Sequence, residues 1–142
     1  MKLAIRPIAD NELDAAWRVL AELRTQLTRE DFDTALARQR KAHGYELLGA
    51  FEEECLVGVL GMREVHTFAR AAHLHVDDLV VSVNARGKGI GKRLIEHAEA
   101  FARERGLAQV FLDSRSGAMG FYERRGYRRH ESVLIKKRLD ET

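Results

Sequence analysis

Glycines and cations are concentrated in one short stretch, "NARGKGIGKR" at residues 84–93, with three glycines within five positions. Glycine lets a backbone approach a ligand closely and adopt positive φ without steric cost. A helical pattern follows directly, so several N–H groups at that helix start would lack partners and face one way. The helix dipole adds roughly half a positive charge there, and Arg86, Lys88, Lys92 and Arg93 carry the same sign. The stretch therefore predicts a phosphate site, most naturally for a diphosphate.

Two familiar phosphate motifs do not fit this spacing. The nucleotide P-loop, G-x-x-x-x-G-K-[ST], would need a glycine at Arg86 and a hydroxyl residue at Arg93. The dinucleotide pattern G-x-G-x-x-G fails because Lys92 occupies the place of its third glycine. The pattern that fits is R-x-x-G-x-G, from Arg86 through Gly89 to Gly91. A flexible glycine turn with solvated cations is the alternative that needs no ligand.

The elements around this stretch predict a mixed α/β sheet built about one core. Period-two and helical spacing of the apolar residues, with capping residues and glycine stops, define the elements. In chain order we expect a strand at 2–8, a helix capped by Asp10, a helix at 28–44 between a capping box at Thr28 and Gly44, two strands within 45–68, a strand at 72–83, a helix from Ile90 closed by Gly106, a strand at 108–114, a helix at 116–126 and one or two strands within 127–139.

Size and composition limit the classes of protein. A chain of 142 residues is expected to form one domain, 1–142, with a real core. A net charge of +2 is too weak to argue for a nucleic-acid binder. Cys55 is the sole cysteine, which favours a reducing compartment. Without a signal-peptide core or an apolar run near the ~20 residues that cross a bilayer, a cytoplasmic protein is expected, with no membrane partner.

At R-x-x-G-x-G the sequence resembles the GNAT acetyltransferase superfamily. The resemblance is strongest in "VDDLVVSVNARGKGIGKRLIEHAEAFARERG" and "VFLDSRSGAMGFYERRGY", and weaker in "IRPIADNELDAAW" and "VLIKKRL". Two separate segments in the right order make the match specific, and it covers nearly the whole chain. It implies an α/β (α+β) fold: a mixed, largely antiparallel central sheet with a splayed pair of strands, flanked by about four helices.

The resemblance also implies how acetyl-CoA binds. The backbone of Leu79, Val80 and Val81 would pair with the pantetheine arm as an added strand does. The coenzyme's pyrophosphate would lie on the loop, with Arg86 nearby; the loop residues are Gly87, Lys88, Gly89, Ile90, Gly91 and Lys92. Plain core packing is the alternative for the three strand side chains, and they would serve as core in either case.

Acetyl transfer to an amine needs a neutral nucleophile, a polarised thioester carbonyl and a proton for the departing thiolate. Tyr122 matches a tyrosine that often protonates coenzyme A in the family; its alternative role is packing, like Phe121. Asp77 stands where relatives can carry a glutamate that deprotonates the amine, often through water. Strand alternation places Asp77 with His75 and Leu79 and turns Asp78 the other way.

The base remains open among several groups. Glu64, His66 and His75 are rivals of Asp77, which alternatively only attracts the cationic substrate. Relatives often have an asparagine where this chain has Arg115, so a hydrogen bond to the coenzyme or the catalytic water is lost, or moves to Ser114 or Ser116. The six histidines show no metal-ligand spacing, and no metal is expected.

The resemblance implies an N-acetyltransferase that moves an acetyl group from acetyl-CoA to a primary amine of a small molecule or peptide, by direct attack in a ternary complex. Two alternatives stay open: an acyltransferase with another acyl-CoA or acceptor, and a non-catalytic CoA-binding regulatory module. The expected partners are acetyl-CoA and the amine, without nucleic acid; a homodimer is left open.

Overall fold

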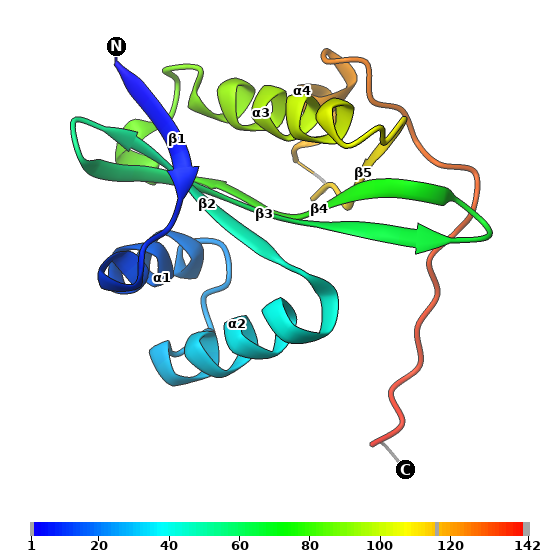
Figure 1. Ribbon diagram of the computed structural model, residues 1–142, viewed down its shortest axis with the longest axis horizontal. Coiled ribbons are helices and arrows are strands. Elements are labelled where there is room, and N and C mark those ends of the chain that lie inside the picture. Colours follow the sequence, from blue (N-terminus) through cyan, green and yellow to red (C-terminus); the bar gives the residue numbers. More distant parts are fainter. Residues whose placement is uncertain (1, 116, 141–142) are drawn as a thin grey trace.

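The centre of the molecule is an open five-stranded sheet with the order β1-β2-β3-β4-β5 (Figure 1). The computed structural model describes residues 2–115 and 117–140, so Ser116 lies outside the described residues. The strands are β1 (Leu3–Pro7), β2 (Glu46–Glu52), β3 (Cys55–Thr67), β4 (Ala71–Val81) and β5 (Val110–Leu112). β1 to β4 are antiparallel and β5 runs parallel to β4. The predicted mixed, largely antiparallel sheet is confirmed.

Helices cover the two faces of the sheet in separate pairs. α1 (Leu13–Ala21) and α2 (Arg29–His43) lie on one face, and α3 (Ile90–Glu104) and α4 (Met119–Glu123) lie on the other (Figure 1). Short 3-10 turns, η1 (Asp10–Glu12) and η2 (Val83–Ala85), precede α1 and the glycine stretch. The described residues thus contain the expected four α-helices.

Local capping signals set most helix ends. The hydroxyl of Thr28 accepts the N–H of Asp31 at 3.1 Å, and Gly44 ends α2 with φ 63°, as predicted. The prediction that Asp10 caps the first helix is wrong. Asp10 lies in η1, and the neighbouring Glu12 carboxylate accepts the Ala9 N–H at 2.8 Å while pairing with Arg6 at 2.7 Å. Glu12 therefore fixes the entry into α1.

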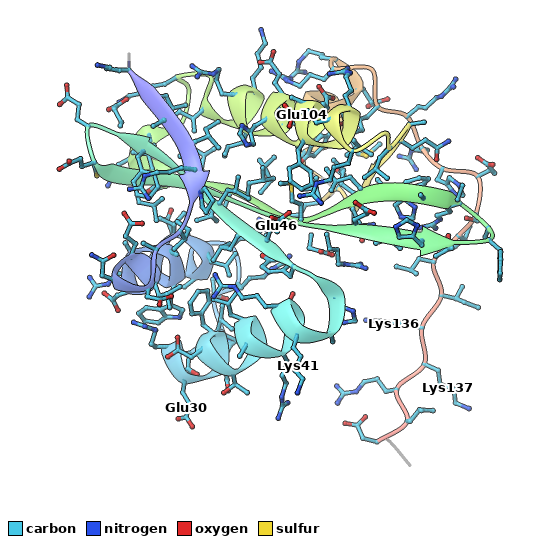
Figure 2. The ribbon with its side chains drawn as sticks, in the orientation of Figure 1. Glu30, Lys41, Glu46, Glu104, Lys136 and Lys137 are labelled. Atoms are coloured by element: carbon cyan, nitrogen blue, oxygen red, sulfur yellow. The ribbon has the colours of Figure 1, made fainter. Side chains whose placement is uncertain are left out.

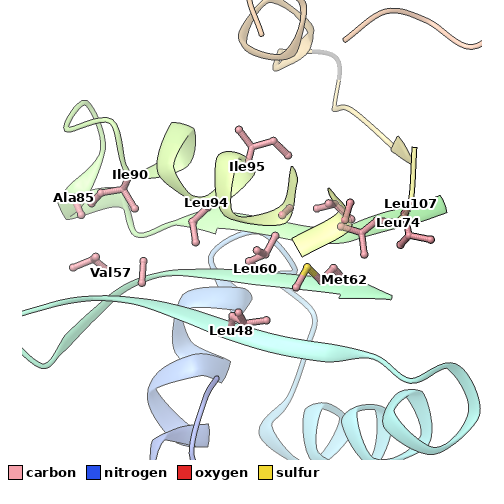
Figure 3. Packing of buried hydrophobic residues seen from close by; sticks show 14 residues of the cluster. Leu48, Val57, Leu60, Met62, Leu74, Ala85, Ile90, Leu94, Ile95 and Leu107 are labelled. Atoms are coloured by element: carbon pink, nitrogen blue, oxygen red, sulfur yellow. The ribbon is translucent and has the colours of Figure 1, made fainter. Parts of the chain in front are cut away.

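Two apolar clusters hold the helices on the sheet. On the α3 face, Leu94 and Ile95 pack against strand residues such as Leu60, Met62 and Leu74, and all five are at most 1% exposed (Figure 3). On the opposite face, residues of α1 and α2 pack against β2, β3 and Val80 of β4. At the end of β4, Val80 is buried in this second cluster and the partly buried Leu79 and Val81 pack against the α3 cluster, so packing holds the three side chains.

β4 and β5 separate after three paired residues. Leu74–Val76 pair with Val110–Leu112, and β4 then continues to Val81 without a β5 partner. This is the splayed pair of strands that the family resemblance implied. It leaves the β5-facing edge of Asp77–Val81 without a strand partner in the described part of the chain.

The C-terminal segment differs from its prediction. Residues 127–140 form no strand or helix, and Figure 1 shows this segment running past the β3–β4 hairpin. Its large apolar side chains are exposed: Val133 by 83%, Leu134 by 80%, Ile135 by 87% and Leu139 by 89%. The expectation of one or two strands within 127–139 is therefore wrong, because β-branched residues favour a strand only where a neighbouring strand pairs with them.

Charged side chains point outward from most of the surface. Figure 2 labels exposed examples on α2, β2, α3 and the C-terminal segment, among them Lys41, Glu46 and Glu104. Among the described residues, no helix is both long and apolar enough to cross a membrane.

Candidate active site

The glycine stretch forms a loop whose backbone needs glycine at two positions. Gly87 has φ 84°, and Gly89, at the N-terminus of α3, has φ 80°. A Cβ at either position would meet no atom within 4 Å, so space beside the loop is open. Gly91 lies inside the first turn of α3, where a Cβ would come 3.4 Å from the Phe121 ring. The first two glycines therefore allow the turn, whereas a Cβ at the third would make only ordinary van der Waals contact with α4.

The loop cations are held in different ways. The Nε of Arg86 donates to the carbonyl of Val81 at 3.2 Å, which turns this guanidinium back to the end of β4. The Lys88 ammonium lies 3.7 Å from the Glu52 carboxylate. Ile90 is 1% exposed, so its side chain belongs to the core and only its backbone faces the loop. With the unpaired N–H groups at the start of α3, the loop has the chemistry of an anion site.

One cavity connects this loop with the rest of the predicted site. It has a volume of about 1020 Å³ and extends from Arg86 and Gly91 along β4 to Tyr122 and on to α1 and α2. Leu79, Val80 and Val81 line it, beside the free edge of β4. Backbone N–H and C=O groups at such an edge can bind an extended ligand as an added strand.

Tyr122 of α4 lines the cavity and is half-buried. Its ring packs edge-on against Phe121 and Tyr127, with centroids 5.0 and 5.9 Å away. Burial raises the pKa of the Tyr122 phenol above its usual value, so it keeps its proton at neutral pH. The neighbouring Tyr127 donates its hydroxyl to Glu99 at 2.8 Å. Within residues 2–115 and 117–140, by contrast, the Tyr122 hydroxyl has no hydrogen-bond partner, which leaves it for a ligand.

Asp77 and Asp78 lie at a β-bulge, which corrects the predicted alternation. Gly61 pairs with Asp78 and Met62 pairs with Val76, so Asp77 is the extra residue on β4. Such a residue interrupts the two-residue period of the strand. Asp77 and Asp78 consequently line the same cavity, and the prediction that Asp78 points away from it is wrong.

The two carboxylates have different partners. One oxygen of Asp77 accepts from the Nε of Arg63 at 2.8 Å, and the other lies 3.9 Å from Nε2 of His75. The Asp77 carboxylate is 25% exposed. Both oxygens of Asp78 are engaged, one with Arg24 at 3.2 Å and one with the Tyr45 hydroxyl, which donates at 2.7 Å. Asp77 therefore keeps an oxygen for a ligand, whereas Asp78 holds the cavity wall together.

Of the rival bases, His75 lies beside the site. Its Nε2 is 3.5 Å from the Asp113 carboxylate as well as 3.9 Å from that of Asp77. Burial lowers the pKa of His75 below 6.5, so the ring is neutral at neutral pH. Glu64 and His66 pair with each other at 2.7 Å and do not line the cavity.

Arg115 and Ser114 line the cavity where the family often has asparagine. Arg115 is exposed, and the Ser114 hydroxyl donates to its carbonyl at 2.9 Å. Among the described residues, no group of three histidine, cysteine or carboxylate side chains could hold a metal. The sequence did not indicate Arg24 or Tyr45, because both reach Asp78 from elements far away in the chain.

Comparisons with known proteins agree with this geometry. A model described as "Acetyltransferase (GNAT) family" matches residues 11–127. The chain belongs to the GNAT acetyltransferase family. This acetyltransferase is 30% identical over 125 residues to the uncharacterized N-acetyltransferase YhdJ of Bacillus subtilis, covering 86% of this chain and 88% of that one. The resemblance inferred from the glycine stretch is thereby confirmed, and the protein is an enzyme that transfers an acetyl group to an amine.

Two further relatives extend the comparison. Over 66 residues the acetyltransferase is 42% identical to the glucosamine 6-phosphate N-acetyltransferase of Trypanosoma brucei brucei, which covers 46% of this chain and 43% of that protein. The crystal structure of a Trypanosoma brucei acetyltransferase superposes with a TM-score of 0.80 at 27% identity, covering 96% of this chain and 99% of that one. The fold of the described residues is thus that of the family.

Proposed function

We propose that acetyl-CoA and a primary amine bind together in the cavity beside β4, and that the amine attacks the thioester directly. The observation that carries this proposal is the continuity of one cavity of about 1020 Å³ from Arg86 and Gly91, on either side of the Gly87–Ile90 backbone, to Tyr122 and Asp77. A single space that reaches both the proposed phosphate-binding loop and the proposed acid and base suits a reaction with both substrates present.

The loop and the free edge of β4 would hold the acyl donor. Gly87 and Gly89 give the loop its positive φ angles with open space beside them. The pyrophosphate would bind the N–H groups from Gly87 to Lys92, and the pantetheine arm would pair with the backbone of Leu79–Val81. When bound, acetyl-CoA supplies an activated acetyl thioester.

Tyr122 would act as the general acid. Its phenol keeps its proton because burial raises its pKa, and its hydroxyl is not used by any described side chain. A proton from this oxygen would go to the departing sulfur, and Tyr122 would recover it from solvent.

Asp77 would attract the ammonium group of the acceptor and accept its proton, directly or through a water molecule. Its free carboxylate oxygen lies near His75, whose neutral ring lies in turn near the exposed Asp113. These distances of 3.9 and 3.5 Å are longer than direct hydrogen bonds, but they place the His75 ring beside both carboxylates. His75 would thus help to carry the proton away from Asp77.

The rest of the proposal concerns assembly and location. We propose that the chain acts as one domain in the cytoplasm, where the exposed thiol of Cys55 stays reduced. The acceptor would be a small molecule or a peptide, and neither nucleic acid, a membrane nor a metal is part of the reaction. A homodimer is compatible with this arrangement.

The test measures amine-dependent release of coenzyme A thiol from acetyl-CoA, together with calorimetry of acetyl-CoA binding. Gly89→Ala places a side chain at positive φ in the loop and should weaken binding by about tenfold, or 1.4 kcal/mol. Gly106→Ala is the matched control, because Gly106 also has positive φ, 72°, and a Cβ there would likewise meet no atom within 4 Å. Equal affinities in the two variants would place the pyrophosphate elsewhere, and an absence of thiol release with every amine would refute the enzymatic proposal.

A further inference from the structure

The half of the cavity that faces away from the glycine loop has a largely apolar wall. We call this surface the α1–α2 wall; its residues come from α1, α2, the connection between them and the start of β2. The apolar members are Leu20, Leu23, Leu27, Phe32, Ala35, Leu36 and Leu47. Leu23, Leu27 and Ala35 remain partly exposed, so this wall presents apolar surface to whatever occupies the cavity.

The α1–α2 wall is held in a fixed shape. The indole Nε1 of Trp17 donates to the carbonyl of Leu27 at 2.8 Å, which ties α1 to the connection that leads into α2. Arg24 and Tyr45 reach from this wall to β4, where both bind Asp78. The apolar surface and the bulge of β4 therefore face each other across a space whose two sides are fastened together.

The charges at this end of the cavity are already compensated. Among the described residues of the α1–α2 wall, Arg24 is the sole cation, and its guanidinium contacts both the Asp78 carboxylate and the Asp77 carbonyl. The nearby Arg63 is bound to Asp77 at 2.8 Å. Because Arg24 and Arg63 are matched by the carboxylates of Asp78 and Asp77, a phosphate or carboxylate on the acceptor would meet no net positive charge from these four groups.

We infer that the acceptor is a primary amine with an apolar body, such as an alkylamine or an arylalkylamine, rather than a phosphorylated or carboxylated amine. The amino group would lie at Asp77, and the apolar body would lie against Leu23, Leu27 and Ala35. This inference rests on the proposed function and adds the class of acceptor to it. It separates this enzyme from relatives that act on glucosamine 6-phosphate.

A series of amines tests the inference through chain length. Burial of one methylene group contributes about 0.8 kcal/mol in a fully apolar contact, which corresponds to a rise of about fourfold in kcat/KM. From propylamine through butylamine to hexylamine, kcat/KM should therefore increase by about two- to fourfold per methylene. Phenylethylamine should be accepted as well as hexylamine, whereas glucosamine 6-phosphate and free lysine should be poorer than propylamine.

Two matched variants locate the effect. Leu27→Ser removes apolar surface from the α1–α2 wall but leaves the backbone carbonyl that binds Trp17, and it should reduce the preference for hexylamine over propylamine by about tenfold. Leu13→Ser makes the same chemical change on α1, where Leu13 packs against the same core cluster but does not line the cavity. Its preference for hexylamine should equal that of the unaltered enzyme.

The outcomes separate this inference from the proposed function. Faster turnover of glucosamine 6-phosphate or lysine than of hexylamine would overturn the inference while leaving acetyl transfer intact. If no amine releases thiol, the proposed function fails, and calorimetry of hexylamine and propylamine with the CoA-bound enzyme decides the inference by itself. Tighter binding of hexylamine that Leu27→Ser abolishes would support it, and equal binding of the two amines would refute it.

Discussion

Gly61 and Tyr45 together provide a sharp test of how the cavity wall is built. Gly61 pairs with Asp78 across β3 and β4, and the Tyr45 ring lies directly over it. A Cβ at Gly61 would lie 2.5 Å from Cζ of Tyr45 and still closer to its hydroxyl. Gly61→Ala must therefore push Tyr45 away and break its hydrogen bond to Asp78.

The expected cost follows from these contacts. A hydrogen bond to a charged group contributes about 1.5–3 kcal/mol, and overpacking a buried site costs about 1–3 kcal/mol. We expect Gly61→Ala to lower the free energy of unfolding by about 3–5 kcal/mol, and Tyr45→Ala to lower it by about 3–5 kcal/mol through loss of a buried ring. With Ala at position 45, Gly61→Ala meets no ring and should cost under about 1 kcal/mol.

Urea unfolding of the two single variants and the double variant measures this coupling as a double-mutant cycle. The free energy of unfolding of the double variant should be about 2–4 kcal/mol higher than the value obtained by adding the effects of the two single changes. Gly117→Ala is a control for the glycine-to-alanine change, because a Cβ there meets no atom within 4 Å. Additive effects at positions 61 and 45, within about 0.5 kcal/mol, would show that Tyr45 does not pack on Gly61.

The remaining predictions concern the proton-handling groups and the loop. Tyr122→Phe should reduce kcat by about 10²–10⁴-fold with little change in the acetyl-CoA Kd, and a normal kcat would assign the ring to packing. Asp77→Asn should reduce kcat/KM at neutral pH, and its kcat/KM should partly recover at higher pH as free amine accumulates. Asp78→Asn should lower the unfolding free energy but keep the shape of the curve of kcat/KM against pH. Burial lowers the pKa of His75, so just below pH 6.5 the unfolded chain binds more protons than the folded chain and the free energy of unfolding falls as the pH drops. His75→Gln should flatten that part of the curve of unfolding free energy against pH. An unchanged slope would contradict this prediction. Glu22→Ala should weaken acetyl-CoA binding by about tenfold through loss of its bonds to Val83 and Ser82, while Glu22→Gln, which can still accept from one and donate to the other, should bind nearly normally.

Features that depend on neighbouring residues could be predicted from the sequence. Thr28 and Gly44 mark the ends of α2, and Gly87 and Gly89 mark the loop before α3, because capping and positive φ are decided within a few residues. The R-x-x-G-x-G spacing of the glycine stretch also carried the resemblance that indicated the family correctly.

Features that depend on distant partners could not be predicted. One extra residue in β4, Asp77, brings Asp78 to the cavity, and strand alternation by itself gives no sign of such a bulge. Arg24 and Tyr45 are 54 and 33 residues away from Asp78 along the chain, so only the folded sheet brings them together. Likewise, the apolar residues near Ile135 have the composition of a strand, but strand formation requires a partner that local sequence does not specify.

The connection between α1 and α2 links the two halves of the cavity. Glu22 accepts from the Val83 N–H at 2.8 Å and the Ser82 hydroxyl at 3.0 Å, just after β4. Two residues later, Arg24 binds Asp77 and Asp78 at the bulge. The free edge at Leu79–Val81 lies between these two attachments, so the same short segment holds both ends of the backbone that we propose pairs with the pantetheine arm. If an acceptor that contacts Leu23 or Leu27 displaced this segment, the glycine loop would also be displaced. The reason is that Glu22 is hydrogen-bonded to Ser82 and Val83, which lead into that loop. From the proposed binding sites we therefore expect the binding of donor and acceptor to be coupled, because each ligand would contact a part of the chain that the other holds in place.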